Sequence, residues 1–193
     1  MAIISDTELR RITNQRFKQG GVILSERRKF SKYSTTTSVF LSHAHIDKDK
    51  IIQVKGILEN LGVEVYVDWM DETMPEKTSG ITASRIKTKI AESKKFILIA
   101  TNPAISSKWC NWEVGIGDTY KSVNGDLAIF GLSDNMGHWK GNEYLQIYPS
   151  IEYEYGNKTN TRGVLISEGF YVFQPTDANG NRTYISLESW FKS

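Results

Sequence analysis

The sequence predicts an α/β fold, in which helices cover both faces of a doubly wound parallel sheet of five strands. Short apolar runs alternate along the chain with segments of helical periodicity, a pattern that is typical of parallel βαβ units. Two of the runs, 95–100 and 127–131, are almost continuously apolar, as expected for strands that are buried on both faces. The length of 193 residues suits one domain of this kind.

Residues 1–37 are predicted to form a short helical extension followed by a basic linker. Ser5 and Glu8 have the spacing of a capping box, which favours a helix that begins there. The glycines at 20–21 would end this helix. The segment holds eight Lys/Arg and three acidic residues, whereas the formal net charge of the chain is +2. It is either a basic arm for a charged partner or a solvated helix and linker, and we favour the second interpretation.

Residues 38–193 are predicted to form one α/β domain. Its expected strands are 39–41, 63–67, 95–100, 127–131 and 170–173, and its expected helices are 48–61, 82–93, one that Ser106 or Ser107 caps and that ends near residue 120, and 186–191. Asp47 is expected to cap the helix that begins at residue 48. Residues 68–79 are polar and predict a long loop. Residues 132–162 predict an irregular, insertion-like segment with one short helix near 143–147.

Composition limits the cellular context and the partners. Cys110 is the one cysteine, so no disulfide can form within the chain, which fits a reducing compartment. The start of the chain does not have the pattern of a signal peptide, and no apolar run approaches the ~18 residues of a membrane span. We therefore expect a cytoplasmic protein without a membrane partner. The small net charge likewise predicts no nucleic acid partner.

Metal and cofactor signatures are weak in this sequence. His43 and His45 are two residues apart and would share a face of an extended chain, but no clear acidic third ligand accompanies them, so we expect no metal site. Neither a phosphate-binding P-loop nor a Rossmann G-x-G-x-x-G fingerprint occurs. We therefore expect no bound cofactor.

Four segments resemble parts of the TIR (Toll/interleukin-1 receptor) domain. Residues 39–43 (VFLSH) are similar to its first strand and the following loop, and 65–68 (VYVD) to the end of its second strand. Residues 68–80 lie where the family has its BB loop, and 107–113 (SKWCNWE) are similar to its W-C-x-x-E motif. The resemblance covers 38–131 well and the remainder loosely. It implies the flavodoxin-like, doubly wound arrangement of that family.

The resemblance also implies a function. Small bacterial proteins of this kind resemble the TIR component of Thoeris-type anti-phage defence systems. Such proteins consume NAD⁺ and make a cyclic or modified ADP-ribose that signals to a separate effector. NAD⁺ would then be a substrate rather than a cofactor, and the protein would associate with itself through TIR–TIR contacts. The alternative is a non-enzymatic TIR module that acts by such contacts alone. A phosphorelay receiver domain is disfavoured, because Ser42 and His43 stand where that class has an acidic pair.

The family motif assigns the catalytic role to Glu113. Breaking the bond between ribose and nicotinamide develops positive charge on the ribose, as in glycoside hydrolysis. An ionised carboxylate beside the ribose stabilises that charge. From its spacing alone, Glu113 is better explained as an acidic residue near a helix N-terminus. The family match is what singles it out.

The remaining candidates surround this carboxylate. Ser42, His43 and Ala44 follow the first strand, at the sheet edge where such folds bind ligands. Asp68 is expected to orient a ribose hydroxyl or merely to turn the chain. Trp69 is expected to stack on nicotinamide or to anchor the loop.

Two residues of the motif are expected to support the site. Trp109 and Cys110 are interpreted as packing residues beneath it. Cys110 as a nucleophile is disfavoured, because no histidine lies near it in the sequence.

Overall fold

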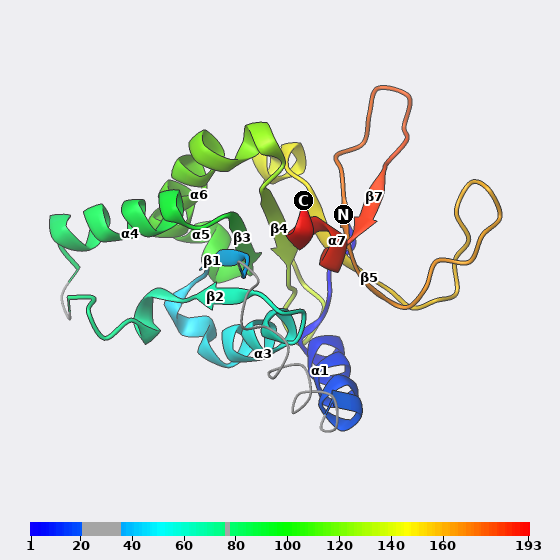
Figure 1. Cartoon of the computed structure of the whole chain (residues 1–193), viewed down its shortest axis with the longest axis horizontal. Coiled ribbons are helices and arrows are strands. Elements are labelled where there is room, and N and C mark those ends of the chain that lie inside the picture. The colour runs from blue at the N-terminus through cyan, green and yellow to red at the C-terminus, as the bar shows by residue number, and fades with distance from the viewer. Residues whose placement is uncertain (21–35, 76–77) are drawn as a thin grey trace.

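The computed structural model describes residues 1–20, 36–75 and 78–193. It has a central, mostly parallel sheet with helices on both faces (Figure 1). The α/β class predicted from the alternation of elements is confirmed. The predicted basic linker lies almost entirely outside the described residues.

The sheet has seven strands in the order β2-β1-β3-β4-β5-β6-β7. The strands are β1 (Ser38–Ser42), β2 (Glu64–Tyr66), β3 (Lys95–Ala100), β4 (Leu127–Gly131), β5 (Ser150–Glu154), β6 (Gly169–Phe173) and β7 (Tyr184–Ser186). The first five in spatial order pair in parallel, and β6 and β7 continue the sheet antiparallel. The sheet therefore exceeds the predicted five strands, and 169–173 is not part of its parallel section.

The fifth parallel strand, β5, lies in the segment that we expected to be irregular. Its five residues are all buried, yet two of them are glutamates, which conceals the strand from an apolar pattern. Glu152 accepts hydrogen bonds from Ser150 and Arg182 at 2.7 and 2.8 Å. Glu154 forms an ion pair with Lys158 at 3.1 Å. Because these partners compensate the buried charges, polar residues can occupy an interior strand.

The helices cover the two faces of the sheet as two groups. They are α1 (Asp6–Gly20), α3 (Lys48–Glu59), α4 (Gly80–Glu92), α5 (Asn102–Ser106), α6 (Lys108–Lys121) and α7 (Leu187–Lys192), with short 3₁₀ turns η1 (His45–Asp47), η2 (Asp68–Met70), η3 (Ser122–Asn124) and η4 (Glu143–Ile147). Buried residues of α1, α3 and α7 belong to one core cluster, and those of α4, α5, α6 and η4 belong to the other. The predicted short helix near 143–147 is η4. Among the described residues, no helix is long and apolar enough to cross a membrane.

The helical extension is built into the same core. Ser5 and Glu8 form the predicted capping box at the start of α1. Ile4 pairs in parallel with Leu132, and Leu9 is completely buried in the core cluster that contains α3. Figure 1 shows α1 beside α3.

Asp47 does not cap α3 as predicted. It precedes the helix, but its side chain makes no capping hydrogen bond. The carboxylate is buried and accepts hydrogen bonds from Thr101 at 2.5 Å and from Lys50 at 3.2 Å. Asp47 thus joins the loop after β1 to the loop after β3, both at the carboxyl edge of the sheet.

Candidate functional site

The centre of the site is a contact between Ser42 and Glu113. Ser42 is the last residue of β1, and Glu113 lies in the second turn of α6. The Ser42 hydroxyl donates a hydrogen bond of 2.5 Å to Oε2 of Glu113. Ser42 is 1% exposed and Glu113 is 6% exposed. The carboxylate predicted from the family motif therefore lies buried at the edge where ligands bind in such folds.

Local sequence places α6 close to the sheet. Ser107 caps the helix by accepting a hydrogen bond from the backbone N–H of Cys110. One turn after Glu113, Gly117 faces the buried ring of Phe96 on β3, and a Cβ atom at Gly117 would lie 3.1 Å from that ring. The absence of a side chain lets the helix approach the sheet at this point. Glu113, four residues earlier on the same face, is thereby brought to the end of β1.

Burial perturbs the acidity of Glu113. The pKa of its carboxyl is raised from 4.5 to about 8 as the net result of three effects: loss of solvent, the largest, raises it, the hydrogen bond from Ser42 lowers it, and the negative charge of Asp68 raises it. Desolvation therefore outweighs the hydrogen bond. A strongly perturbed carboxyl at a ligand-binding edge is typical of a functional site.

Asp68 supplies a second carboxylate near the first. It begins η2, directly after β2, and its side chain is 33% exposed. Its Oδ1 accepts a hydrogen bond of 2.8 Å from the backbone N–H of Trp69 and lies 3.6 Å from Nε2 of His43. The site therefore combines a buried carboxyl with a carboxylate that is accessible to ligand.

His43 and Ala44 lie deeper than we predicted for residues that bind substrate. The His43 side chain is 4% exposed, and its Nδ1 lies 2.9 Å from the carbonyl oxygen of Leu41. Ala44 is buried in the core cluster on the α6 side of the sheet.

Trp69 packs in the manner of a loop anchor. Its indole lies against the core cluster that contains α3. The ammonium of Lys48 lies 5.0 Å from the ring centroid, and the ring of His43 contacts it edge-on at 6.5 Å. These neighbours favour the anchoring interpretation over stacking on nicotinamide.

The two supporting residues differ from each other. Cys110 is buried beside the site, and burial raises the pKa of its thiol to about 11, which argues against a thiolate nucleophile. Trp109 is 37% exposed and contacts Trp112 edge-on at 5.2 Å. The prediction that Trp109 packs beneath the site is therefore wrong, because α6 turns its Cys110 face toward the sheet and this pair toward solvent.

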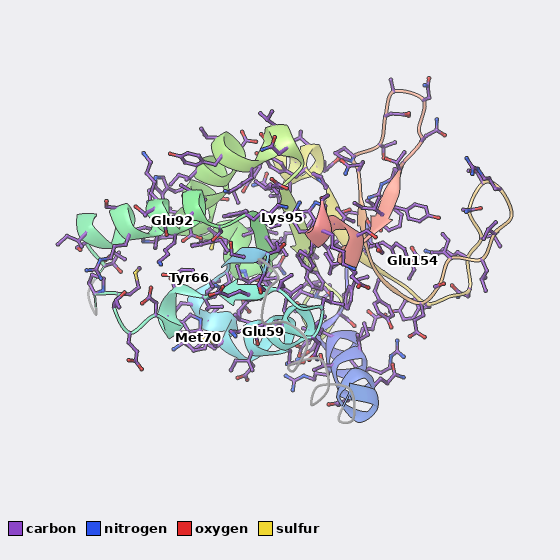
Figure 2. The ribbon with its side chains drawn as sticks, in the orientation of Figure 1. Glu59, Tyr66, Met70, Glu92, Lys95 and Glu154 are labelled. Carbon is purple, nitrogen blue, oxygen red and sulfur yellow. The ribbon has the colours of Figure 1, made fainter. Side chains whose placement is uncertain are left out.

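Sequence reasoning missed Tyr66, which is labelled in Figure 2. It donates a hydrogen bond of 2.9 Å to Asp71 and packs against the core cluster that contains Cys110. Burial raises the pKa of its phenol, and the charges of Asp71, Asp68 and Glu113 add to this effect. Because successive side chains of a strand point to opposite faces, the sequence of β2 could have predicted that Tyr66 lies on the other face of the sheet from Val65.

Within the described part of the chain, no three His, Cys, Asp or Glu side chains converge in the manner of a metal site. The arrangement instead suits a ligand that presents positive charge to Glu113 and hydrogen-bonding groups to Asp68.

Comparison with known proteins identifies the family of the chain. The family model described as "TIR domain" matches residues 39–149. The chain is 31% identical over 115 residues to a "Probable 3' cyclic ADP-D-ribose synthase ThsB'" of Bacillus cereus (strain MSX-D12), which covers 58% of this chain and 59% of that protein. It is 26% identical over 99 residues to a "Putative cyclic ADP-D-ribose synthase TIR2" of Cytobacillus dafuensis, and this alignment covers 50% of this chain and 25% of that protein.

The matches to these two bacterial relatives thus span about three fifths and a quarter of their lengths. The family match itself extends over more than half of the chain and includes β1, the loop after β2 and the start of α6. The chain therefore belongs to the TIR domain family, as the order and spacing of the four similar segments predicted.

Proposed function

We propose that this protein is an enzyme that cleaves NAD⁺ between nicotinamide and ribose and converts the remainder into a cyclic ADP-ribose. The observation that carries this proposal is the buried carboxyl of Glu113, held by Ser42 at the carboxyl edge of the sheet. The family match and the printed names of the two relatives, both cyclic ADP-D-ribose synthases, support it.

The proposed chemistry uses the charge of Glu113. The bond between C1′ and the nicotinamide nitrogen breaks, and its electron pair leaves with neutral nicotinamide. Positive charge develops on the ribose, and the carboxylate of Glu113 stabilises it. A nucleophilic group of the same ADP-ribose then bonds to C1′, closes the ring and releases any proton that it carries to solvent. If water attacks C1′ instead, it loses a proton to solvent and gives the linear product. Asp68, which is accessible, accepts a hydrogen bond from a ribose hydroxyl.

Substrate binding and ionisation of Glu113 are coupled in this scheme. A pKa of about 8 means that the carboxyl is largely protonated at neutral pH in the free protein. The cationic nicotinamide ring of NAD⁺ favours the ionised carboxylate, because an opposite charge at short range lowers the pKa of an acid. Binding of NAD⁺ therefore creates the charge that the reaction needs.

The non-enzymatic alternative does not account for this carboxyl. Burying an ionisable group costs free energy unless its partners compensate for the loss of water. Ser42 compensates only in part, because the pKa of Glu113 remains raised. A module that acts only by association does not need a buried carboxyl, whereas an enzyme that stabilises positive charge does.

Association and enzymatic activity are compatible. The exposed pair of Trp109 and Trp112 on α6 is a surface feature that suits contact with another protein. We propose that copies of the chain associate through TIR–TIR contacts and that the nucleotide product acts on a separate effector in anti-phage defence. We also propose that the reaction needs no cofactor besides its substrate.

The test is incubation of purified protein with NAD⁺, with chromatographic detection of nicotinamide and of the nucleotide product. A concentration series allows self-association to contribute. Glu113→Gln preserves the shape of the side chain and removes its charge, so we expect loss of cleavage by ~100-fold or more. Glu92→Gln, an exposed carboxyl on α4, is the matched control. Equal rates for wild type and Glu113→Gln, both folded, would overturn the proposal.

A further inference from the structure

The imidazole of His43 faces two acceptors within the protein. Its Nδ1 lies 2.9 Å from the carbonyl oxygen of Leu41, and its Nε2 lies 3.6 Å from Oδ1 of Asp68. The side chain is only 4% exposed. Both ring nitrogens therefore face protein oxygens, and both carry a proton toward them only when the ring is protonated. Little of the ring is accessible to a ligand.

Asp68 has the opposite character. Its side chain is 33% exposed, and it is close enough to Glu113 for its charge to raise the pKa of that carboxyl. Its Oδ1 receives the backbone N–H of Trp69 at 2.8 Å and also faces His43. One oxygen of Asp68 is thus directed inward by two protein groups, which orients the carboxylate while part of it remains exposed.

The surroundings of His43 restrict its ring to this orientation. The bond to Leu41 fixes one nitrogen, and the indole of Trp69 contacts the ring edge-on. Trp69 is itself held against the core cluster that contains α3. The imidazole consequently connects the end of β1 to the first residue of η2, where Asp68 begins the loop after β2.

From these contacts we propose that His43 is a positioning residue, which fixes the carboxylate of Asp68 at the mouth of the Glu113 site. Asp68, rather than His43, then contacts the ribose of NAD⁺. This inference rests on the proposed function. It replaces the prediction that His43 binds substrate, and it assigns to Asp68 the orientation of the ribose toward Glu113.

Two amide substitutions separate the two contacts of the ring. The amide nitrogen of Gln reaches the place of Nε2, so His43→Gln still directs an N–H group toward Asp68 but loses the contact with Leu41. The amide nitrogen of Asn reaches the place of Nδ1, so His43→Asn keeps the Leu41 bond and loses Asp68. If positioning of Asp68 is the role of His43, the Gln variant is the more active of the two.

The expected kinetic effect follows from a polar contact with a charged group, because Nε2 of His43 lies 3.6 Å from Oδ1 of Asp68, beyond hydrogen-bond length. We expect His43→Asn to lower kcat/KM for NAD⁺ by about 10- to 100-fold, mostly through KM, whereas His43→Gln lowers it by less than about 10-fold. Asp68→Asn should show the same rise in KM. The double variant with Asn at both positions should lose no more than Asp68→Asn alone, because both changes remove one interaction.

The outcomes that would overturn the inference are equally specific. Equal or greater activity of His43→Asn compared with His43→Gln would show that only the Leu41 contact matters. Additive losses in the double variant would show that His43 and Asp68 act independently. Thermal melting of each variant shows whether a loss of activity reflects unfolding.

A second readout does not depend on activity. The side-chain carboxyl ¹³C signal of Asp68, measured by NMR, should move in His43→Asn and stay near its wild-type position in His43→Gln. An unmoved signal in His43→Asn would overturn the inference even if NAD⁺ is cleaved. Absence of cleavage by wild-type protein would overturn the proposed function, and the NMR comparison would still decide the link between His43 and Asp68.

Discussion

Thr101 donates a hydrogen bond of 2.5 Å to the buried carboxylate of Asp47, and this contact joins the loops after β1 and β3. Both loops lie at the edge of the sheet that carries Ser42. The same Thr101 hydroxyl caps α5 by accepting the backbone N–H of Ala104. The framework beneath the site therefore depends on a carboxylate that the reaction does not use.

Replacing Asp47 should destabilise the protein. Asp47→Ala removes the acceptor of both Thr101 and Lys50, and we expect the free energy of unfolding to fall by about 1–3 kcal/mol. Asp49→Ala, at an exposed position in the first turn of the same helix, should change it by less than about 0.5 kcal/mol. Urea unfolding measures both. Equal effects of the two variants would contradict the structural role of Asp47.

Removing the Ser42 hydroxyl should shift the pH dependence of catalysis. The hydrogen bond from Ser42 lowers the pKa of Glu113, so Ser42→Ala should raise that pKa. The rising limb of kcat/KM against pH, which reports the free enzyme, should move to higher pH. Ser84→Ala, on the exposed side of α4, should leave the profile in place. A profile that stays unchanged in Ser42→Ala would separate the hydroxyl from the ionisation of Glu113.

Glu113 should make the protein less stable as pH rises. Its pKa is raised from 4.5 to about 8 by folding, so in this window the folded state binds the proton and the unfolded state does not. The free energy of unfolding therefore falls with increasing pH, by up to about 1.4 kcal/mol per pH unit. Glu113→Gln abolishes this contribution and should be the more stable protein at the upper end of the window.

The measurement is urea unfolding of wild type and Glu113→Gln across that pH range. The two curves should converge toward pH 4.5 and separate as the pH increases. Glu92→Gln should follow wild type throughout. Parallel curves for Glu113→Gln and wild type would mean that Glu113 is not protonated in the folded protein.

Lys95, labelled in Figure 2, lies far from the site, and its replacement should strongly lower the free energy of unfolding. It is completely buried at the start of β3, pairs with Asp126, and lies 4.6 Å from the ring of Trp190 in α7. Lys95→Ala should lower the free energy of unfolding by about 3–5 kcal/mol, because it leaves Asp126 without its ion-pair partner. Its exposed neighbour Lys94 offers the matched control, and Lys94→Ala should be close to neutral.

Measurements of catalytic activity distinguish a loss of stability in Lys95→Ala from a loss of catalysis. Lys95 lies at the amino end of β3, whereas Ser42 lies at the carboxyl end of the neighbouring parallel strand. At a temperature where Lys95→Ala is folded, its kcat/KM for NAD⁺ should therefore match wild type. A strong loss there would connect the two ends of the sheet.

The parallel centre of the sheet was predictable because its strands are buried on both faces. The runs 95–100 and 127–131 are strands β3 and β4, with only one polar side chain between them, Lys95. The same criterion failed at β5, where two glutamates are buried. Glu152 has a partner in a distant segment, Arg182, whereas Glu154 pairs with Lys158 four residues later. It also could not give the direction of β6, since an apolar run is the same in a parallel and an antiparallel strand.

The site was predictable in part. The family motif singled out Glu113, but nothing local indicates its bond to Ser42, which lies 71 residues away in sequence. The alternation of an extended chain could have separated Ser42 from His43, since neighbouring residues point to opposite faces. We instead assigned both to substrate. The exposure of Trp109 depended on the rotation of α6, which a single motif does not fix.

The close approach of Gly117 to Phe96 makes the geometry of the site depend on a residue that has no side chain. Helix α6 rests on the sheet at this point, one turn beyond Glu113. A methyl group added there would lie 3.1 Å from the ring of Phe96, so the helix or the ring would have to shift by a few tenths of an ångström. A shift of the helix would change the distance between Ser42 and Glu113 from a position that touches neither residue, so substitution at 117 is a way to alter the acidity of the carboxyl without changing the residues that carry the chemistry.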